Sequence, residues 1–138
     1  MLTEGHGVPI GLSIDGANRH DMKLAEATLA SVPITRPTPT PTHPQNLSLD
    51  KGYDYEVVRE TVATFGYTAH LRTRGEEIID KRDLPGYRAR RWVVERTHSW
   101  MNRFRRLLIR WEKNAENYLA LLHFACAWIA FRAAGVLG

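Results

Sequence analysis

The chain has 138 residues, of which 43% are hydrophobic and 25% are charged. This composition is typical of a globular protein of one domain and excludes disordered and fibrous classes. Its single cysteine, Cys126, cannot form an internal disulfide, and no CxxC motif or Cys/His cluster suggests a zinc site. The N-terminus has neither a basic start nor a continuous apolar run, so it does not read as a secretory signal, and we expect a cytoplasmic protein.

The first predicted elements alternate between strand and helix. Residues 8–15 (VPIGLSID) read as a short strand, and a helix is expected from about His20 to Val32. Residues 33–46 hold five of the seven prolines, which predicts an extended connector without a packed core of its own. Residues 46–50 (NLSLD) form a second candidate strand that ends in an acid.

The second half of the chain is predicted to be mainly helical. Apolar residues recur at helical spacing over 53–65, Gly66 ends that helix, and residues 67–71 (YTAHL) read as a third strand. A polar, turn-rich passage follows over 72–86. From about residue 91 the apolar residues again have a helical period, which predicts a core-facing stripe. The members of this stripe are Val93, Trp100, Phe104, Leu107, Leu108 and Trp111.

The last expected helix begins after Asn114, a plausible N-cap, and is apolar almost all round. A membrane span is the alternative, but a bilayer requires ~20 largely uninterrupted apolar residues, and His123 and Arg132 leave too few. We therefore expect a buried packing helix, with His123, Trp111 and Trp128 in the core. The order of elements indicates an α/β sandwich with a mostly parallel sheet, in which three strands are few.

Charge is distributed unevenly along the chain, although its overall excess is only +4. Residues 81–113 contain 11 basic residues against three acids, so the remainder is net acidic. Guanidinium groups match phosphate oxygens, so this basic band fits a polyanion such as DNA. The alternative is a solvated helix face with no ligand.

Two acids are distinguished by their positions. Asp50 follows a predicted strand, at the edge where open α/β sheets collect ligands, and Glu95 lies on the polar side of the basic helix with Arg91, His98, Asn102 and Arg106 around it. If the two carboxylates converge, their oxygens suit Mg²⁺, which completes its shell with water and substrate phosphate. The alternatives are a turn-forming aspartate and a glutamate paired with Arg91 or Ser99 along the helix.

Two longer segments carry a family resemblance. The segment LDKGYDYEVVRETVATFGYTAHLRTRGEE and the segment RRWVVERTHSWMNRFRRLLIRWEK resemble the C-terminal part of the catalytic domain of bacterial insertion-sequence DDE transposases. The resemblance implies a partial RNase H-like fold, with a mixed sheet flanked by helices and without its first strands. It assigns Asp50 as the second aspartate and Glu95 as the glutamate of the metal-binding set, while Arg91 matches the arginine four positions before that glutamate.

The resemblance implies a Mg²⁺- or Mn²⁺-dependent activity, DNA cleavage and strand transfer during transposition, with transposon ends and target DNA as partners. No residue of the chain matches the first catalytic aspartate, so we expect a truncated transposase, residues 1–138, that is inactive alone. The alternative is a non-catalytic fragment that binds DNA or an intact transposase, or self-associates. We expect no membrane partner and a location at the bacterial nucleoid. The candidate DNA-binding residues are Arg88, Arg91, Arg103, Arg105 and Arg106.

Overall fold

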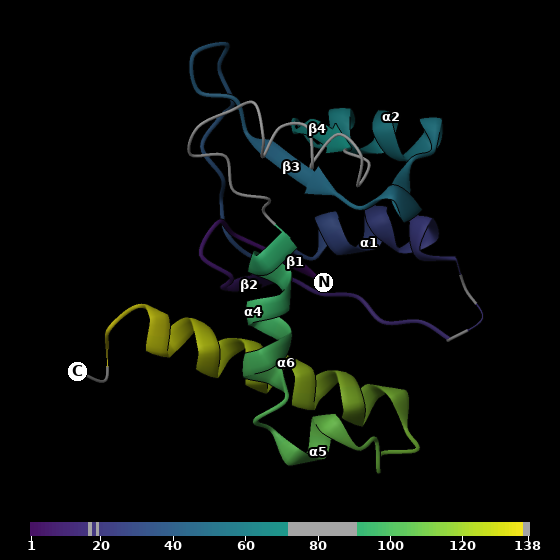
Figure 1. The fold of residues 1–138 in the computed structure, drawn as a ribbon, viewed down its shortest axis with the longest axis vertical. Helices are drawn as coiled ribbons and strands as arrows, with labels where there is room; N and C mark the ends of the chain where they lie inside the picture. Colours follow the sequence, from purple (N-terminus) through teal and green to yellow (C-terminus); the bar gives the residue numbers. More distant parts are fainter. Residues whose placement is uncertain (17, 19, 72–90, 137–138) are drawn as a thin grey trace, which may run out of the picture.

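The computed structural model describes residues 1–16, 18, 20–71 and 91–136. Its described part is a mixed α/β structure built around two hydrophobic clusters (Figure 1). The elements in chain order are β1 (Leu2–Thr3), β2 (Pro9–Gly11), the 3₁₀ helix η1 (Asp21–Leu24), α1 (Ala25–Ala30), β3 (Asn46–Leu49), the 3₁₀ helix η2 (Lys51–Tyr53), α2 (Glu56–Thr64), β4 (Thr68–Leu71), α4 (Arg91–Met101), α5 (Arg105–Leu108) and α6 (Ala115–Ala133).

The first cluster joins α1 and α2 to a parallel pair of strands. Strands β3 and β4 pair in register from Asn46 opposite Thr68 to Leu49 opposite Leu71. Side chains alternate along a strand, so Leu47 is buried against the helices while its neighbours Asn46 and Ser48 are exposed. The buried members of this cluster are Leu29, Leu47, Val58 and Val62. The predicted strands over 46–50 and 67–71 and the helix between them are confirmed.

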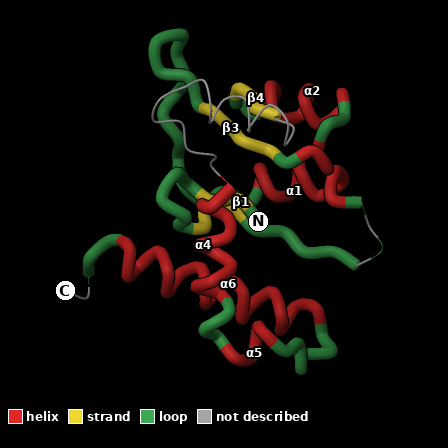
Figure 2. Tube along the Cα trace, viewed as in Figure 1, coloured by secondary structure: helices red, strands yellow, loops and turns green. Residues whose placement is uncertain are grey.

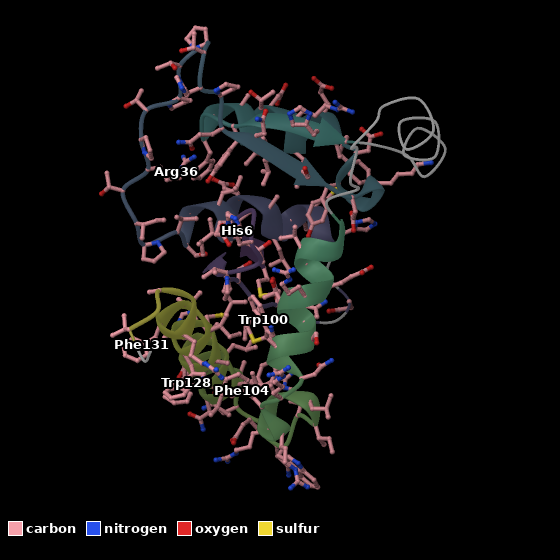
Figure 3. All side chains as sticks on the ribbon, turned by 60° about the vertical axis from the view of Figure 1, so that its left-hand side comes forward. His6, Arg36, Trp100, Phe104, Trp128 and Phe131 are labelled. Carbon is pink, nitrogen blue, oxygen red and sulfur yellow. The ribbon has the colours of Figure 1, made fainter. Side chains whose placement is uncertain are left out.

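The second cluster lies where α4 crosses α6 (Figure 1). Met101 of α4 and Ala125 and Ile129 of α6 are buried there. Trp100 packs against this cluster between the two helices (Figure 3). Partial burial raises the pKa of the nearby Cys126 thiol above its ordinary value of 9.0, so it stays protonated at neutral pH.

A short N-terminal hairpin connects the clusters. β1 pairs antiparallel with β2, and Leu2 packs on the first cluster while Met1 packs on the second. Gly11 of β2 lies against α1 so closely that a Cβ there would be 2.8 Å from the Thr28 carbonyl oxygen. The hairpin therefore needs a residue without a side chain at this contact.

The strand pairing differs from the expectation of one mostly parallel sheet. The described strands form two two-stranded sheets, β1–β2 and β3–β4, coloured yellow in Figure 2. Only three residues long, β2 begins at Pro9, which has no N–H to donate, and its partner β1 precedes it across a local turn. The α/β class is confirmed, and the RNase H-like arrangement remains a prediction.

The proline-rich connector over 33–46 is attached to the first cluster, although it contributes no core of its own. The Arg36 guanidinium donates to Gln45 Oε1 and to the Phe65 carbonyl oxygen, each at 2.6 Å, and lies 4.0 Å from the centre of the Tyr67 ring. Gln45 in turn donates to the Pro37 carbonyl at 2.6 Å. One arginine thus connects both ends of the connector to the loop before β4.

We expect Arg36→Ala to lower the free energy of unfolding by about 1–3 kcal/mol, because hydrogen bonds made by charged groups contribute this much and the cation–π contact is lost too. Urea denaturation monitored by circular dichroism measures the change. Arg59→Ala is the matched control, since among the described residues the contact of Arg59 is a surface pair with Asp54, with 45% and 44% of the side chains exposed. That variant should change stability by less than about 1 kcal/mol. Equal losses in both variants would contradict a special role for Arg36.

The basic helix is interrupted, which corrects part of the predicted stripe. α4 ends at Met101, and Phe104 takes an extended conformation before α5 begins at Arg105. Phe104 and Leu107 still pack against the second cluster. The prediction is wrong for the last two members, since Leu108 and Trp111 are 61% and 73% exposed. A single helical period cannot extend across a break in the backbone.

The prediction of a buried final helix is only partly right. Ala125 and Ile129 are buried, but His123 is exposed and Trp128 is 44% exposed, so the core prediction is wrong for both. Trp128 and Phe131 lie together on the outer side of α6, with ring centroids 6.4 Å apart (Figure 3). Among the helices in the described ranges, none combines the length and hydropathy that crossing a bilayer requires.

Candidate metal and nucleic-acid site

Asp50 lies directly after β3, as predicted, and its carboxylate is exposed. The side chain caps η2: Oδ1 accepts a hydrogen bond from the Gly52 N–H at 2.9 Å. A Cβ on residue 52 would lie 3.1 Å from that oxygen, so glycine keeps the cap uncrowded. This hydrogen bond fixes the orientation of the carboxylate at the end of the strand.

Glu95 lies on the exposed side of α4. His98 and Asn102 are exposed on that side too, whereas Val93, Thr97 and Met101 are buried on the opposite side. His98 on the same helix and Asn102 directly after it are thus exposed, as predicted for the polar side, and their proximity to Glu95 remains a prediction.

Of the two arginines expected beside Glu95, Arg91 begins the same helix, whereas Arg106 does not belong to it. Arg106 belongs to the separate helix α5, and its guanidinium pairs with Glu112 at 2.5 Å. Its expected place on one continuous helix with Glu95 is wrong, because the helix is interrupted after Met101. α4 begins at Arg91, and Arg88 lies outside the described residues.

The position of α4 depends on a contact with the N-terminal hairpin that sequence analysis missed. Thr97 is fully buried, and its hydroxyl donates to the Gly7 carbonyl oxygen and lies 3.1 Å from the Val93 carbonyl oxygen. Gly7 has a φ of +91° and packs against the α4 backbone. The two glycines of the segment EGHG were the available signal for this tight turn.

The turn before Gly7 is held by Glu4. Its Oε1 accepts hydrogen bonds from the N–H groups of His6 and Val8, at 2.8 and 2.9 Å, and its Oε2 lies 2.9 Å from the His6 ring. Partial burial acts to raise the pKa of the Glu4 carboxyl, but the hydrogen bonds from Val8 and His6 outweigh it. The net pKa is lowered from its ordinary value of 4.5.

A lowered pKa in the folded state makes the contribution of Glu4 to stability depend on pH. The contribution is full above the unfolded pKa of about 4.5 and is lost as pH falls through the lower folded value. We expect Glu4→Gln to remove this part of the acid sensitivity, which urea denaturation at a series of pH values measures. An unchanged pH dependence would show that the turn does not bind the carboxylate preferentially in its ionised form.

The basic residues of α5 and its flanks differ in their exposure and in their hydrogen-bond partners. Arg103 and Arg105 are exposed. Arg110 donates from Nε to the Glu112 carbonyl oxygen at 3.3 Å, and its guanidinium lies 5.0 Å from the centre of the Tyr118 ring. Together with Arg106, these residues place positive charge along α5 and the loop that follows it, where phosphates can approach from solvent.

The donor chemistry of the two acids fits Mg²⁺, which prefers hard oxygen ligands. In the described ranges, no group of three or more His, Cys, Asp or Glu side chains is arranged to hold a metal ion. Asp50 follows a strand of the first cluster, and Glu95 lies on a helix that packs in the second. Their convergence on one ion therefore remains a prediction.

Residues 1–130 match the family model described as the transposase DDE domain. The chain is 34% identical over 138 residues to the "Putative transposase for insertion sequence element IS402" of Burkholderia cepacia, covering 95% of this chain and 61% of the relative. No solved structure matches. The chain belongs to the DDE transposase family, as the resemblance of its motifs predicted.

Proposed function

We propose that this chain carries two of the acids of a DDE transposase site, with Asp50 and Glu95 as ligands of Mg²⁺ or Mn²⁺, and that it binds DNA through its basic residues. The observation that carries the proposal is the exposed, hydrogen-bonded carboxylate of Asp50 at the end of β3, in a chain of this family. The proposed phosphate contacts are Arg88, Arg91, Arg103, Arg105 and Arg106.

The two acids would bind the metal and the arginines would bind the DNA. Asp50 Oδ1 accepts a hydrogen bond from the Gly52 N–H, which orients the carboxylate, and Oδ2 would bind the metal. Glu95 offers its carboxylate from the exposed side of a helix that Thr97 fixes to the hairpin. When bound, the metal would activate the attacking oxygen and stabilise the leaving oxygen in cleavage and strand transfer. The arginines would hold the DNA backbone against this surface.

The family's metal site uses three acids, and motif resemblance assigns two of them to this chain. We propose that residues 1–138 by themselves bind DNA without cutting it. The finer activity, cleavage of transposon ends and strand transfer, would then need a further carboxylate. The chain spans 61% of the length of its IS402 relative, and the activity of a whole transposase is part of the proposal.

Metal binding tests the assignment of the acids. We expect Mn²⁺ affinity, measured by titration calorimetry, to fall at least severalfold in Asp50→Asn and Glu95→Gln. Asp54→Asn is the matched control, because Asp54 is an exposed acid nearby whose carboxylate already pairs with Arg59. Equal affinity in all four proteins would remove Asp50 and Glu95 as ligands.

Nicking of supercoiled DNA with Mg²⁺ tests the second part of the proposal. We expect no nicking by the chain alone, while DNA binding persists. Nicking that disappears in Asp50→Asn would show that the acid set is complete within these residues, and would contradict the proposal of binding without cleavage.

The second candidate function is a non-catalytic module that pairs with another transposase chain. The exposed aromatic pair Trp128–Phe131 on the outer side of α6 favours it, because exposed apolar patches commonly mark protein contacts. Light scattering of the chain alone and mixed with a full-length relative tests this function. A mass that stays monomeric in both samples would exclude it.

A further inference from the structure

An open hollow of about 490 Å³ lies between α5 and the first half of α6, outside the proposed metal site. Helix α5 lies below this half of α6 in Figure 1. The hollow is lined by both apolar and polar side chains. Its lining consists of Ala120, Leu121 and Phe124, and of Arg106, Glu112 and Asn117.

On one side the hollow is lined by Glu112, from the loop that joins the two helices. Glu112 pairs through its carboxylate with Arg106 at 2.5 Å and accepts at its carbonyl oxygen from Arg110 at 3.3 Å. Asn114 then caps α6, accepting from the Glu116 N–H at 2.8 Å. Hydrogen bonds on both sides of Glu112 thus connect this loop to α5 and to the first turn of α6.

The lining groups match the parts of a nucleotide. Phe124 is 63% exposed, so a flat ring can stack on its face. The Asn117 amide has both a donor and an acceptor, as the edge of a base requires. Arg106, whose side chain is 70% exposed, can reach a phosphate beside its bond to Glu112.

The charge around the hollow favours a polynucleotide over an apolar protein segment. Residues 102–114 contain five basic residues and one acid. An apolar helix seated here would remove the Arg106–Glu112 pair and the neighbouring cations from water without giving them new partners, which is costly. A nucleic-acid strand covers the apolar part of the lining with a base and neutralises the surrounding cations with phosphates.

We infer that this hollow binds an unpaired nucleobase of the DNA held by the basic residues, with Phe124 stacking on the base and Asn117 bonding its edge. The inference rests on the proposed DNA binding and names a subsite for it. A base that is paired within a duplex cannot reach the hollow without leaving the stack, so the site would select DNA with an extrahelical or overhanging nucleotide.

Fluorescence anisotropy tests the inference with two labelled DNAs, a blunt duplex and the same duplex with one extrahelical nucleotide. We expect the intact chain to bind the second roughly tenfold more tightly, as stacking of one base provides. Phe124→Ala should reduce this ratio to about one and leave the affinity for the blunt duplex unchanged. Phe131→Ala is the matched control, because it truncates an exposed phenylalanine of the same helix away from the hollow.

The possible results of this experiment distinguish the binding of an unpaired base from the proposed DNA binding in general. Blunt-duplex binding without any preference for the unpaired base would overturn this inference and leave the proposed DNA binding intact. A preference that survives in Phe124→Ala would place the base elsewhere. Failure to bind either DNA would contradict the proposed function itself. A dimer that light scattering detects in the intact chain but not in Phe124→Ala would assign the hollow to a second copy instead.

Discussion

Gly7→Ala is expected to lower the free energy of unfolding by about 2 kcal/mol or more. Gly7 has a φ of +91°, which side chains disfavour. An added Cβ would also lie 3.2 Å from the Val93 carbonyl oxygen and 3.3 Å from Thr97 Oγ1. Thermal and urea denaturation measure the loss. Gly5→Ala is the control within the same turn, since no atom of the described residues lies within 4 Å of a Cβ there.

The partner of Gly7 provides an independent check on this contact. Thr97→Val keeps the volume of a fully buried side chain but leaves the Gly7 carbonyl without its hydroxyl donor. We expect a loss of about 1–3 kcal/mol, with Thr97→Ser recovering much of it because the hydroxyl remains. If Gly7→Ala and Thr97→Val leave stability unchanged, the hairpin does not position α4 and hence does not position Glu95.

The double variant Arg103→Ala/Arg105→Ala is expected to weaken DNA binding strongly and to make it less dependent on salt. Each phosphate contact that is lost should reduce the slope of log K against log salt by about one. Both arginines are exposed, whereas Arg106 is already paired with Glu112. Anisotropy titrations at several salt concentrations measure affinity and slope together.

The control for charge alone is Arg59→Ala, an exposed arginine of α2 outside the basic band. It should reduce affinity only slightly, because a net charge acts weakly at a distance in salt. An unchanged slope in the double variant, or an equal loss in Arg59→Ala, would show that α5 and its flanks are not the DNA-binding surface.

The local elements could be predicted because each has a pattern that nearby residues determine. The short run over 46–50 predicted β3, in which Leu47 is buried, and helical spacing over 53–65 predicted α2, in which Val58 and Val62 are buried. The position of Asp50 after a strand also follows from local sequence, since the cap it forms involves only the next two residues. The family resemblance rested on several motifs in the right order, and the match of residues 1–130 to the family model confirmed it.

Predictions that assumed one uninterrupted helix failed at its break. The break between Met101 and Arg105 moved Leu108 and Trp111 into solvent and gave Arg106 a new partner, Glu112. The apolar character of α6 likewise predicted burial on all sides, while the described contacts cover one side only. Periodicity indicates which residues share a face, but the surface that covers this face is decided elsewhere in the chain.

By itself, the sequence determined the α/β class, the elements β3, α2 and β4, the basic band and the membership of the DDE transposase family. The tertiary structure alone decided that Thr97 bonds to Gly7, 90 positions earlier, that Arg36 secures the proline-rich connector, and that α5 and α6 line an open hollow. The reason is physical: local patterns depend on the spacing of neighbouring side chains, whereas these contacts depend on where distant backbone segments meet when two hydrophobic clusters pack.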